Sequence, residues 1–226
     1  MDLKRSYEFF QPEKMEGRVH IIGCGAVGST LAENLAHLGI KQFSLYDFDT
    51  VEPHNVANQM FTAEDIGKLK VDAVAETITR INPDISLEKR ALRLYKHGYS
   101  DQPLDGYVFL AVDNIDLRRR IVEENKANPL IKYIFDFRVG LEDSQHFAAD
   151  WRRASDVERL LSTMDFSHDE AKAAQPVSAC NEPLSVAPTI RSIVSLGVAN
   201  FMNVVKDKPW KHIILFNPFE YGMKTY

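Results

Sequence analysis

The feature that most constrains the fold is a glycine motif between two short apolar runs, at residues 19–22 and 43–46. A helical pattern joins the motif to the second run. A strand, a tight glycine turn and a helix in this order form a nucleotide-binding βαβ unit, because the turn lets the backbone approach phosphates and the helix start points free N–H groups at them. The residues predicted to face the phosphates are Gly23, Gly25, Ala26 and Gly28.

Two acidic residues follow the second apolar run. Asp47 lies about twenty residues beyond the motif, where a carboxylate accepts hydrogen bonds from ribose hydroxyls. The same strand brings Asp49 to the carboxyl end of the sheet, where open α/β proteins bind their ligands. A nicotinamide cofactor suits this arrangement as well as ATP does, so the motif alone leaves an NAD-dependent oxidoreductase open.

The remaining pattern predicts an α/β fold. It is Rossmann-like, with a mostly parallel sheet and helices on both faces, in a single domain over residues 1–226 that begins with a lead-in at residues 1–17. Residues 165–187 are mainly polar and are predicted to form a mobile crossover, after short helical pieces at residues 156–164. Further strands are predicted at residues 85–87, 107–112, 131–137 and 213–216, and further helices at residues 64–81 and from residue 188.

The predicted helix at residues 64–81 carries a lysine inside its apolar stripe. Lys70 needs a partner anion or must stretch to the edge of the stripe, so it either reaches nucleotide phosphates or snorkels to water. Just before this helix, Asn55 and Gln59 are four residues apart and would project from one side of a helical turn. Either both amides reach one ligand, or Asn55 caps the turn and Gln59 is solvated.

Asp113 and Asn114 stand between a buried strand and a helix. Asp113 either caps the helix or holds magnesium on a triphosphate, because carboxylate oxygens suit that cation. Its position on the same sheet edge as Asp47 favours magnesium. Cys180 directly follows the polar, alanine-rich stretch at residues 171–179 and is either an acyl acceptor or a small buried residue.

Composition limits the classes of function. A formal net charge of −5 leaves no broad basic face for nucleic acid, so we expect small-molecule or protein partners. No apolar run reaches the roughly 18 residues of a membrane span, and the N-terminus lacks a signal-peptide pattern, which indicates a cytoplasmic protein. The two cysteines form neither a disulfide framework nor a four-cysteine zinc site.

Several motifs occur in a fixed order along the chain: residues 23–28, residues 47–51, Asn55 with Gln59, Gly67 with Lys70, residues 81–83, and Asp113-Asn114 with Arg118. Together they resemble the ThiF/MoeB/HesA superfamily of ubiquitin-activating-type adenylyltransferases. The resemblance implies a homodimeric or pseudo-dimeric α/β fold that binds ATP and magnesium. It also implies adenylation of the C-terminal carboxylate of a ubiquitin-like protein, a sulfur-carrier protein or a peptide.

By position, the resemblance also implies a role for each candidate residue. Asp47 would bind ribose, and Asn55 and Lys70 would contact phosphate oxygens. Asp113 would hold magnesium, and Cys180 matches a cysteine that some members use to form a thioester or acyl disulfide. The other residues of the implied nucleotide site are Asp49, Asn58, Gln59 and Asn114.

Two departures from the family pattern stand out. Asn58 occupies a position where many members have an arginine that contacts phosphate. Either Arg5 of a dimer partner or Arg138 replaces that arginine, or adenylation is weakened. A chain with weakened adenylation would be a non-catalytic nucleotide-binding scaffold. The paired C-x-x-C motifs that hold zinc in many relatives are also absent, so no zinc is expected.

Overall fold

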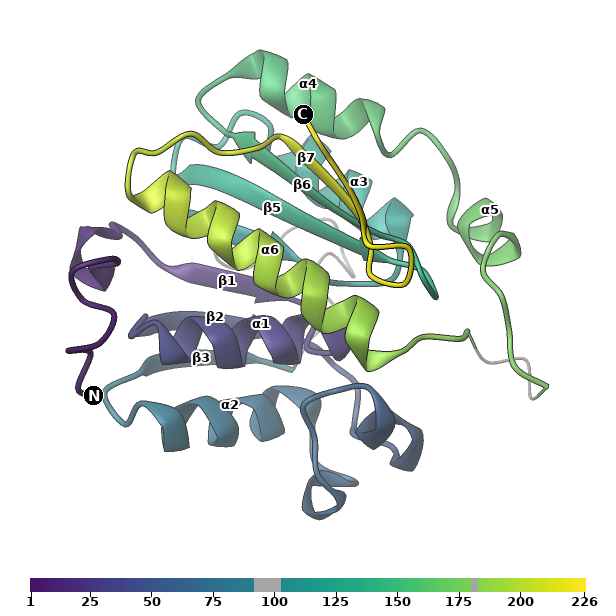
Figure 1. The fold of residues 1–226 in the computed structure, drawn as a ribbon, viewed down its shortest axis with the longest axis horizontal. Coiled ribbons are helices and arrows are strands. Elements are labelled where there is room, and N and C mark those ends of the chain that lie inside the picture. Colours follow the sequence, from purple (N-terminus) through teal and green to yellow (C-terminus); the bar gives the residue numbers. More distant parts are fainter. Residues whose placement is uncertain (92–102, 180–182) are drawn as a thin grey trace.

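The computed structural model describes residues 1–91, 103–179 and 183–226. In these ranges, the chain forms one eight-stranded sheet with helices packed against both faces (Figure 1). The strand order is β3-β2-β1-β4-β5-β6-β7-β8. The strands are β1 (Val19–Ile22), β2 (Gln42–Tyr46), β3 (Ser86–Arg90), β4 (Gly106–Leu110), β5 (Ile131–Val139), β6 (Ser144–Asp150), β7 (Ile213–Asn217) and β8 (Gly222–Thr225). The α-helices are α1 (Ala26–His37), α2 (Lys70–Ile81), α3 (Ile115–Asn125), α4 (Ala154–Ser162), α5 (His168–Ala173) and α6 (Ala187–Val205).

The first five strands are parallel and carry the candidate site. β1 lies between β2 and β4, because Val19 pairs with Phe43 on one side and with Tyr107 on the other. The chain therefore extends the sheet from β1 first on the β2 side and later on the β4 side. Open α/β sheets bind ligands outside the carboxyl ends of their strands at such a switch point. β1 and β4 are buried along their whole lengths, which explains their continuous apolar character in the sequence.

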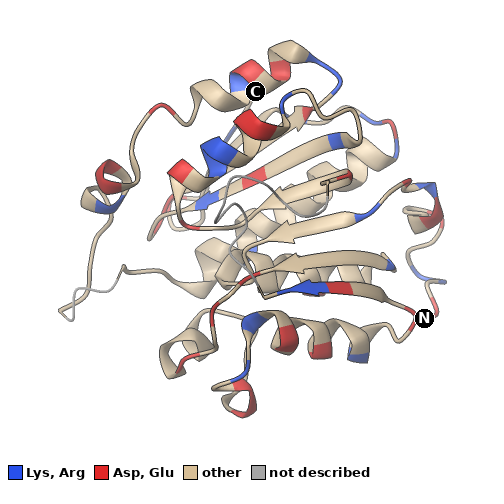
Figure 2. Cartoon of the chain, turned by 180° about the vertical axis from the view of Figure 1, so that it is seen from behind, with Lys and Arg blue, Asp and Glu red and all other residues tan. Residues whose placement is uncertain are grey.

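The last three strands are antiparallel and extend the sheet beyond β5. The two edges of the sheet are thus β3 and β8. β3 carries Glu88, Lys89 and Arg90, so both signs of charge lie along that edge (Figure 2). β8 has only four residues, of which Met223 is 57% exposed.

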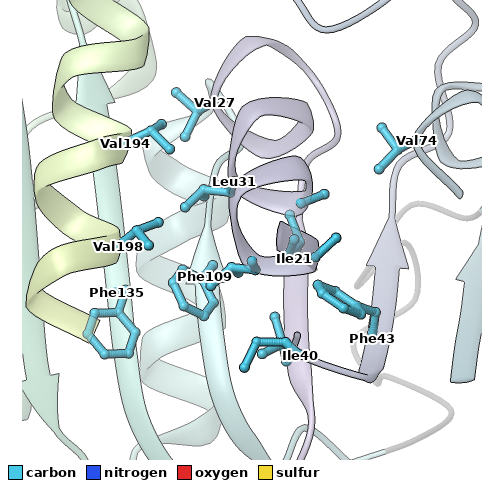
Figure 3. Packing of buried hydrophobic residues seen from close by; sticks show 14 of the residues in the cluster. Ile21, Val27, Leu31, Ile40, Phe43, Val74, Phe109, Phe135, Val194 and Val198 are labelled. Atoms are coloured by element: carbon cyan, nitrogen blue, oxygen red, sulfur yellow. The ribbon is translucent and has the colours of Figure 1, made fainter. Parts of the chain in front are cut away.

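Helices α1, α2 and α6 cover one face of the sheet, while α3 and α4 cover the other. α1 lies between α2 and α6, and its Val27 faces Val194 of α6 (Figure 3). Below α6, the ring of Phe109 stacks on Phe135 with centroids 4.9 Å apart and meets the edge of Phe201 at 5.5 Å. Burial of each such ring contributes about 2 kcal/mol to stability.

The predicted α/β fold with helices on both faces is confirmed, but the predicted start of the helix at residues 64–81 is wrong. α2 begins at Lys70. Residues before it form a short 3-10 helix, η3 (Ala63–Asp65), and a turn at Gly67, whose φ of +89° favours glycine. Ile66, which the predicted stripe included, is 44% exposed. Lys70 therefore stands at the N-terminal end of the apolar stripe and not in its middle.

Three elements were not predicted: β6, α5 and β8. α5 lies within the segment at residues 165–187, and a capping box between Ser167 and Glu170 starts it. The mobility of that segment and its place in a single domain stay predictions. α4 matches the helical pieces expected at residues 156–164.

No helix in the described ranges combines the length and apolar character that crossing a bilayer requires. The cytoplasmic location stays a prediction.

Candidate functional site

The glycine turn between β1 and α1 contains glycines of two kinds. A Cβ on Gly28 would overlap the carbonyl oxygen of Gly23, and a Cβ on Gly23 would lie 2.7 Å from the carbonyl carbon of Ala111. These two glycines are required by the packing of the chain on itself. Gly25 differs, because its φ is an ordinary −76° and a Cβ there would meet only Gln59 Oε1, at 3.9 Å. No other described residue fills the space beside Gly25, as the approach of a ligand to the backbone requires.

Asp47 holds the glycine turn in place. Its Oδ2 accepts a hydrogen bond from the Cys24 amide at 2.6 Å, and its Oδ1 accepts one from the Asp49 amide at 2.9 Å. Burial raises the pKa of Asp47, while these two hydrogen bonds and the charge of Lys70 oppose the rise. A carboxylate has about four acceptor positions, so two remain for ribose hydroxyls.

Lys70 reaches the site through backbone pairing between two loop segments. The Lys70 amide donates to Asp49 O at 2.9 Å, and the Val51 amide donates to Lys68 O at 2.8 Å. The Lys70 ammonium then forms an ion pair with Asp49 Oδ2 at 3.1 Å, and its side chain is only 11% exposed. The lysine thus has an anionic partner at the sheet edge, and its interpretation as a lysine that merely snorkels from an apolar stripe is wrong.

The segment that follows β2 places one amide oxygen, that of Gln59, beside the glycine turn. Asn55 is buried, and its Oδ1 accepts from the Glu52 amide at 2.9 Å, so it caps the short 3-10 helix η2 (Pro53–Ala57). Gln59 Oε1 and Asn58 Oδ1 are buried, and neither accepts a hydrogen bond from the described part of the chain. Gln59 is half-buried, and its oxygen faces Gly25 and not open water, which does not favour the alternative of a fully solvated Gln59.

The end of β4 presents Asp113 to solvent. The predicted capping role belongs to Asn114, whose Oδ1 accepts from the Leu117 amide at 2.8 Å at the start of α3. Asp113 is exposed, and its carboxylate makes no hydrogen bond within the described ranges. Behind it, the buried Arg118 donates to the Val112 carbonyl and pairs with Asp136, which anchors the strand end that carries Asp113.

Arg138 is bound within its own chain, and its replacement of a phosphate-binding arginine at position 58 stays a prediction that these contacts do not favour. Its guanidinium is bound to Asp136 Oδ2 at 2.8 Å and to Thr163 O at 2.6 Å, and it lies over the ring of Phe147. These contacts satisfy a planar guanidinium on several sides.

Arg5 is exposed in the N-terminal segment, which packs against the far end of α1. Leu3 is the nearest side chain to the Cβ position of Gly39, just beyond the last turn of that helix. In its own chain, the N-terminal segment that carries Arg5 therefore lies at the end of α1 opposite the glycine turn (Figure 1). Its action from a dimer partner stays a prediction. Cys180 lies outside the described residues.

Three residues at the site carried no recognised signal in the sequence. Ser29 Oγ accepts from the Met60 amide at 3.1 Å, and Ser185 Oγ accepts from Asn58 Nδ2. Arg191 of α6 places its Nη2 3.8 Å from Met60 Sδ. Ser185 contacts a residue 127 positions earlier in the chain, and Arg191 one 131 positions earlier. Local sequence patterns give no information over such separations.

The ThiF family model matches residues 7–134, more than half of the chain and all of the parallel strands except the end of β5. The chain belongs to the ThiF family. Ubiquitin-like modifier-activating enzyme 5 of Oryza sativa subsp. japonica is 42% identical over 76 residues, which cover 34% of this chain and 18% of the relative. The enzyme of the same name from Drosophila willistoni is 35% identical over 107 residues, which cover 47% and 24%. The match thus spans less than a quarter of these relatives.

The fold of this ThiF-family chain is similar to that of solved structures. E. coli MccB with AMPCPP and MccA superposes with a TM-score of 0.74 at 17% identity, over 95% of this chain and 65% of MccB. PaaA superposes with a TM-score of 0.69 at 18% identity, over 95% and 65%. At such identities the likeness shows the fold alone.

The described residues suit a magnesium ion that one carboxylate and a nucleotide would bind together. They do not suit an ion that is held by protein side chains alone. No group of three or more His, Cys, Asp or Glu side chains in the described ranges is arranged to hold a metal ion. Magnesium on a nucleotide usually takes one or two carboxylates together with phosphate oxygens and water. Asp113, exposed and without a hydrogen-bond partner in those ranges, is a suitable single carboxylate.

Proposed function

We propose that this chain is an ATP-dependent adenylyltransferase that activates the C-terminal carboxylate of a ubiquitin-like or sulfur-carrier protein or of a peptide. The observation that carries the proposal is the space beside Gly25, which no other described residue fills, together with the Lys70 ammonium, whose charge acts on the adjacent Cys24. A nicotinamide cofactor carries a diphosphate and needs no metal, whereas a triphosphate calls for both the lysine and the free carboxylate of Asp113.

The similar proteins agree with this proposal. MccB has been solved with ATP, and with an ATP analogue together with the peptide MccA. The relatives in plants and insects are named as ubiquitin-like modifier-activating enzymes. The partners that these names give, a ubiquitin-like modifier and MccA, fit the substrate class of the proposal.

In the proposed reaction, one oxygen of the substrate carboxylate forms a bond to the α-phosphorus of ATP. The bond from that phosphorus to the oxygen bridging to the β-phosphate breaks, and pyrophosphate leaves with the electron pair. Both reactants are anions, so the protein acts mainly by positioning them and by neutralising charge. Asp113 would hold magnesium, and Asn114 would lie beside the nucleotide. The positive charge of magnesium would stabilise the departing pyrophosphate.

Lys70 would exchange Asp49 for a phosphate oxygen when ATP binds. The Asp49 side chain is 50% exposed, and ion pairs with such an exposed partner contribute only about 0–1 kcal/mol, so the exchange costs little. Asp47 would bind the ribose, and the amides of the glycine turn would face the phosphates. We place the action of Arg5 from the second protomer of a homodimer, and thiol transfer by Cys180, within the same proposal.

Exchange of label between pyrophosphate and ATP tests this function in the full chain, with candidate glycine-ended ubiquitin-like proteins and peptides added in turn. We expect magnesium-dependent exchange with one of them. Lys70→Met should reduce the exchange rate by at least about a hundredfold, because removal of a positioned charge costs about 3 kcal/mol of transition-state stabilisation. Lys41→Met, at an exposed lysine just beyond α1, is the matched control and should exchange like the natural chain.

Two outcomes would contradict the proposal. ATP binding without exchange for any partner would indicate a non-catalytic nucleotide-binding scaffold. Binding of NAD in preference to ATP, measured by calorimetry, would indicate the oxidoreductase that the glycine motif alone allows.

A further inference from the structure

We propose that Arg191 is an anion-binding residue of the nucleotide site and supplies the phosphates with a second positive charge besides that of Lys70. This inference rests on the proposed function, because it takes ATP as the ligand. Neither the glycine motif nor the acidic residues point to α6 as a source of phosphate contacts.

The position of the Arg191 guanidinium carries the inference. Its Nη2 lies 3.8 Å from the sulfur of Met60. The amide of Met60 donates to Ser29 Oγ at 3.1 Å, and Ser29 lies close to the N-terminal end of α1. The guanidinium therefore lies next to the segment that borders the glycine turn, one residue from Gln59.

The helix that carries Arg191 is held firmly against this segment. Asn58 Nδ2 donates to Ser185 Oγ just before α6, and Thr189 Oγ1 donates to Leu141 O at 2.8 Å in its first turn. Val194 then packs on Val27, at the start of α1 (Figure 3). The backbone at Arg191 is thus fixed relative to the glycine turn, while its side chain is exposed and able to reach a ligand.

The guanidinium has no anionic partner in the described part of the chain. Its one hydrogen-bond contact there is with a thioether sulfur, which is a weak acceptor. Nearby, Asn58 Oδ1 and Gln59 Oε1 are buried acceptors that receive no hydrogen bond from the described residues. Arginine has five donors in a planar fork, enough to bind a phosphate through two of them and still donate to a side-chain oxygen.

The two cations would approach the phosphates from different sides. Lys70 starts α2 and Arg191 belongs to α6, and these helices flank α1 on the same face of the sheet (Figure 1). The glycine turn at the start of α1 lies between them. A triphosphate there would be neutralised from both flanks, which a single lysine on one flank does not achieve.

Calorimetric titration of the full chain with ATP and with AMP, in the presence of magnesium, tests the inference. We expect Arg191→Gln to weaken ATP binding about ten- to a hundredfold, as loss of a charge-assisted hydrogen bond does. AMP binding should not change, because AMP lacks the β- and γ-phosphates. Lys206→Gln removes a cation from the other end of α6 and should leave both affinities unchanged.

A second variant separates charge from structure. Adding Asn58→Arg to Arg191→Gln returns a guanidinium to the same loop, and we expect ATP affinity to recover. The inference is overturned if Arg191→Gln binds ATP like the natural chain, or if it loses ATP and AMP affinity equally together with a lower Tm. Failure of the natural chain itself to bind ATP would instead refute the proposed function.

Discussion

At the scale of single residues, His146 of β6 is a titratable group that the proposed chemistry does not use. It is fully buried, and its ring lies against Phe137, with centroids 4.5 Å apart. The amide nitrogen of Asn200 donates to its Nε2 at 3.2 Å, so the proton sits on Nδ1, which has no partner among the described residues. Burial lowers the pKa of His146 from 6.5 to about 4.

This histidine should make the fold sensitive to acid. Between pH 6.5 and about 4, the unfolded chain binds a proton that the folded chain does not, so the free energy of unfolding falls as the pH is lowered through that window. The loss amounts to about 3 kcal/mol. Urea unfolding of the natural chain and of His146→Gln measures it, because the variant lacks this titration and all other groups are shared. Parallel stability profiles over that window would contradict the prediction.

Chemical function at individual residues was only partly predictable from sequence. Asp47 and Asp113 follow predicted strand ends, and because parallel strands end at one edge, sequence order alone placed these two together. Lys70 was predicted inside a helix, and its position at the same edge depends on the pairing of its loop with residues 49–51. The exchange of roles between Asp113 and Asn114 was not predictable, since both residue types cap helices well. The position of Arg191 was not predictable from the sequence, because its contact with Met60 depends on how α6 packs against α1.

At the scale of elements, the turn from β1 to α1 contains one glycine that the fold requires and one that leaves room for a ligand. Gly28 leaves no room for a Cβ, because the carbonyl of Gly23 occupies that place. Gly25 has room for one, yet the position is glycine.

The two glycines should therefore respond differently to the same substitution. Gly28→Ala should lower the free energy of unfolding by about 3 kcal/mol, because the backbone must move to relieve the overlap. Gly25→Ala should lower the free energy of unfolding by only about 1 kcal/mol, because alanine is a poorer N-cap than glycine. It should nevertheless weaken ATP binding about tenfold, a loss of about 1.4 kcal/mol. Thermal unfolding and calorimetric titration of both variants distinguish the effects, and equal destabilisation would refute the distinction.

The predictable elements are those whose burial leaves a mark on the sequence. β1, β4 and β5 are covered on both faces and read as apolar runs. β6 is equally buried but contains Ser144, His146 and Asp150, whose polar groups find partners only in the folded chain. The start of α2 is not evident from the sequence, because the residues before it continue a helical spacing although the chain turns at Gly67.

At the scale of the whole molecule, the N-terminal segment lies at the end of α1 opposite the glycine turn (Figure 1). If Arg5 contributes to adenylation, it must therefore act on the site of another copy. A symmetric pair of chains would exchange N-terminal segments between two sites.

This arrangement predicts complementation between two inactive proteins. Arg5→Ala and Lys70→Met should each lose pyrophosphate exchange as pure proteins, whereas a mixture allowed to exchange subunits should regain activity. A mixed dimer contains one site that has both Lys70 and the partner's arginine. Light scattering verifies that dimers form, and a mixture as inactive as its components would contradict action between subunits.

The uneven ends of the sheet have a consequence for how copies of the chain meet at high concentration. An open strand edge is a template on which another sheet edge can add, and charged side chains or shortness are the usual protections. β3 is protected by Glu88, Lys89 and Arg90, which an added strand would have to desolvate. β8 is protected against such pairing by its length of only four residues and by Lys224, which follows the exposed Met223. Edge-to-edge aggregation is therefore resisted electrostatically at one end and mainly by lack of length at the other.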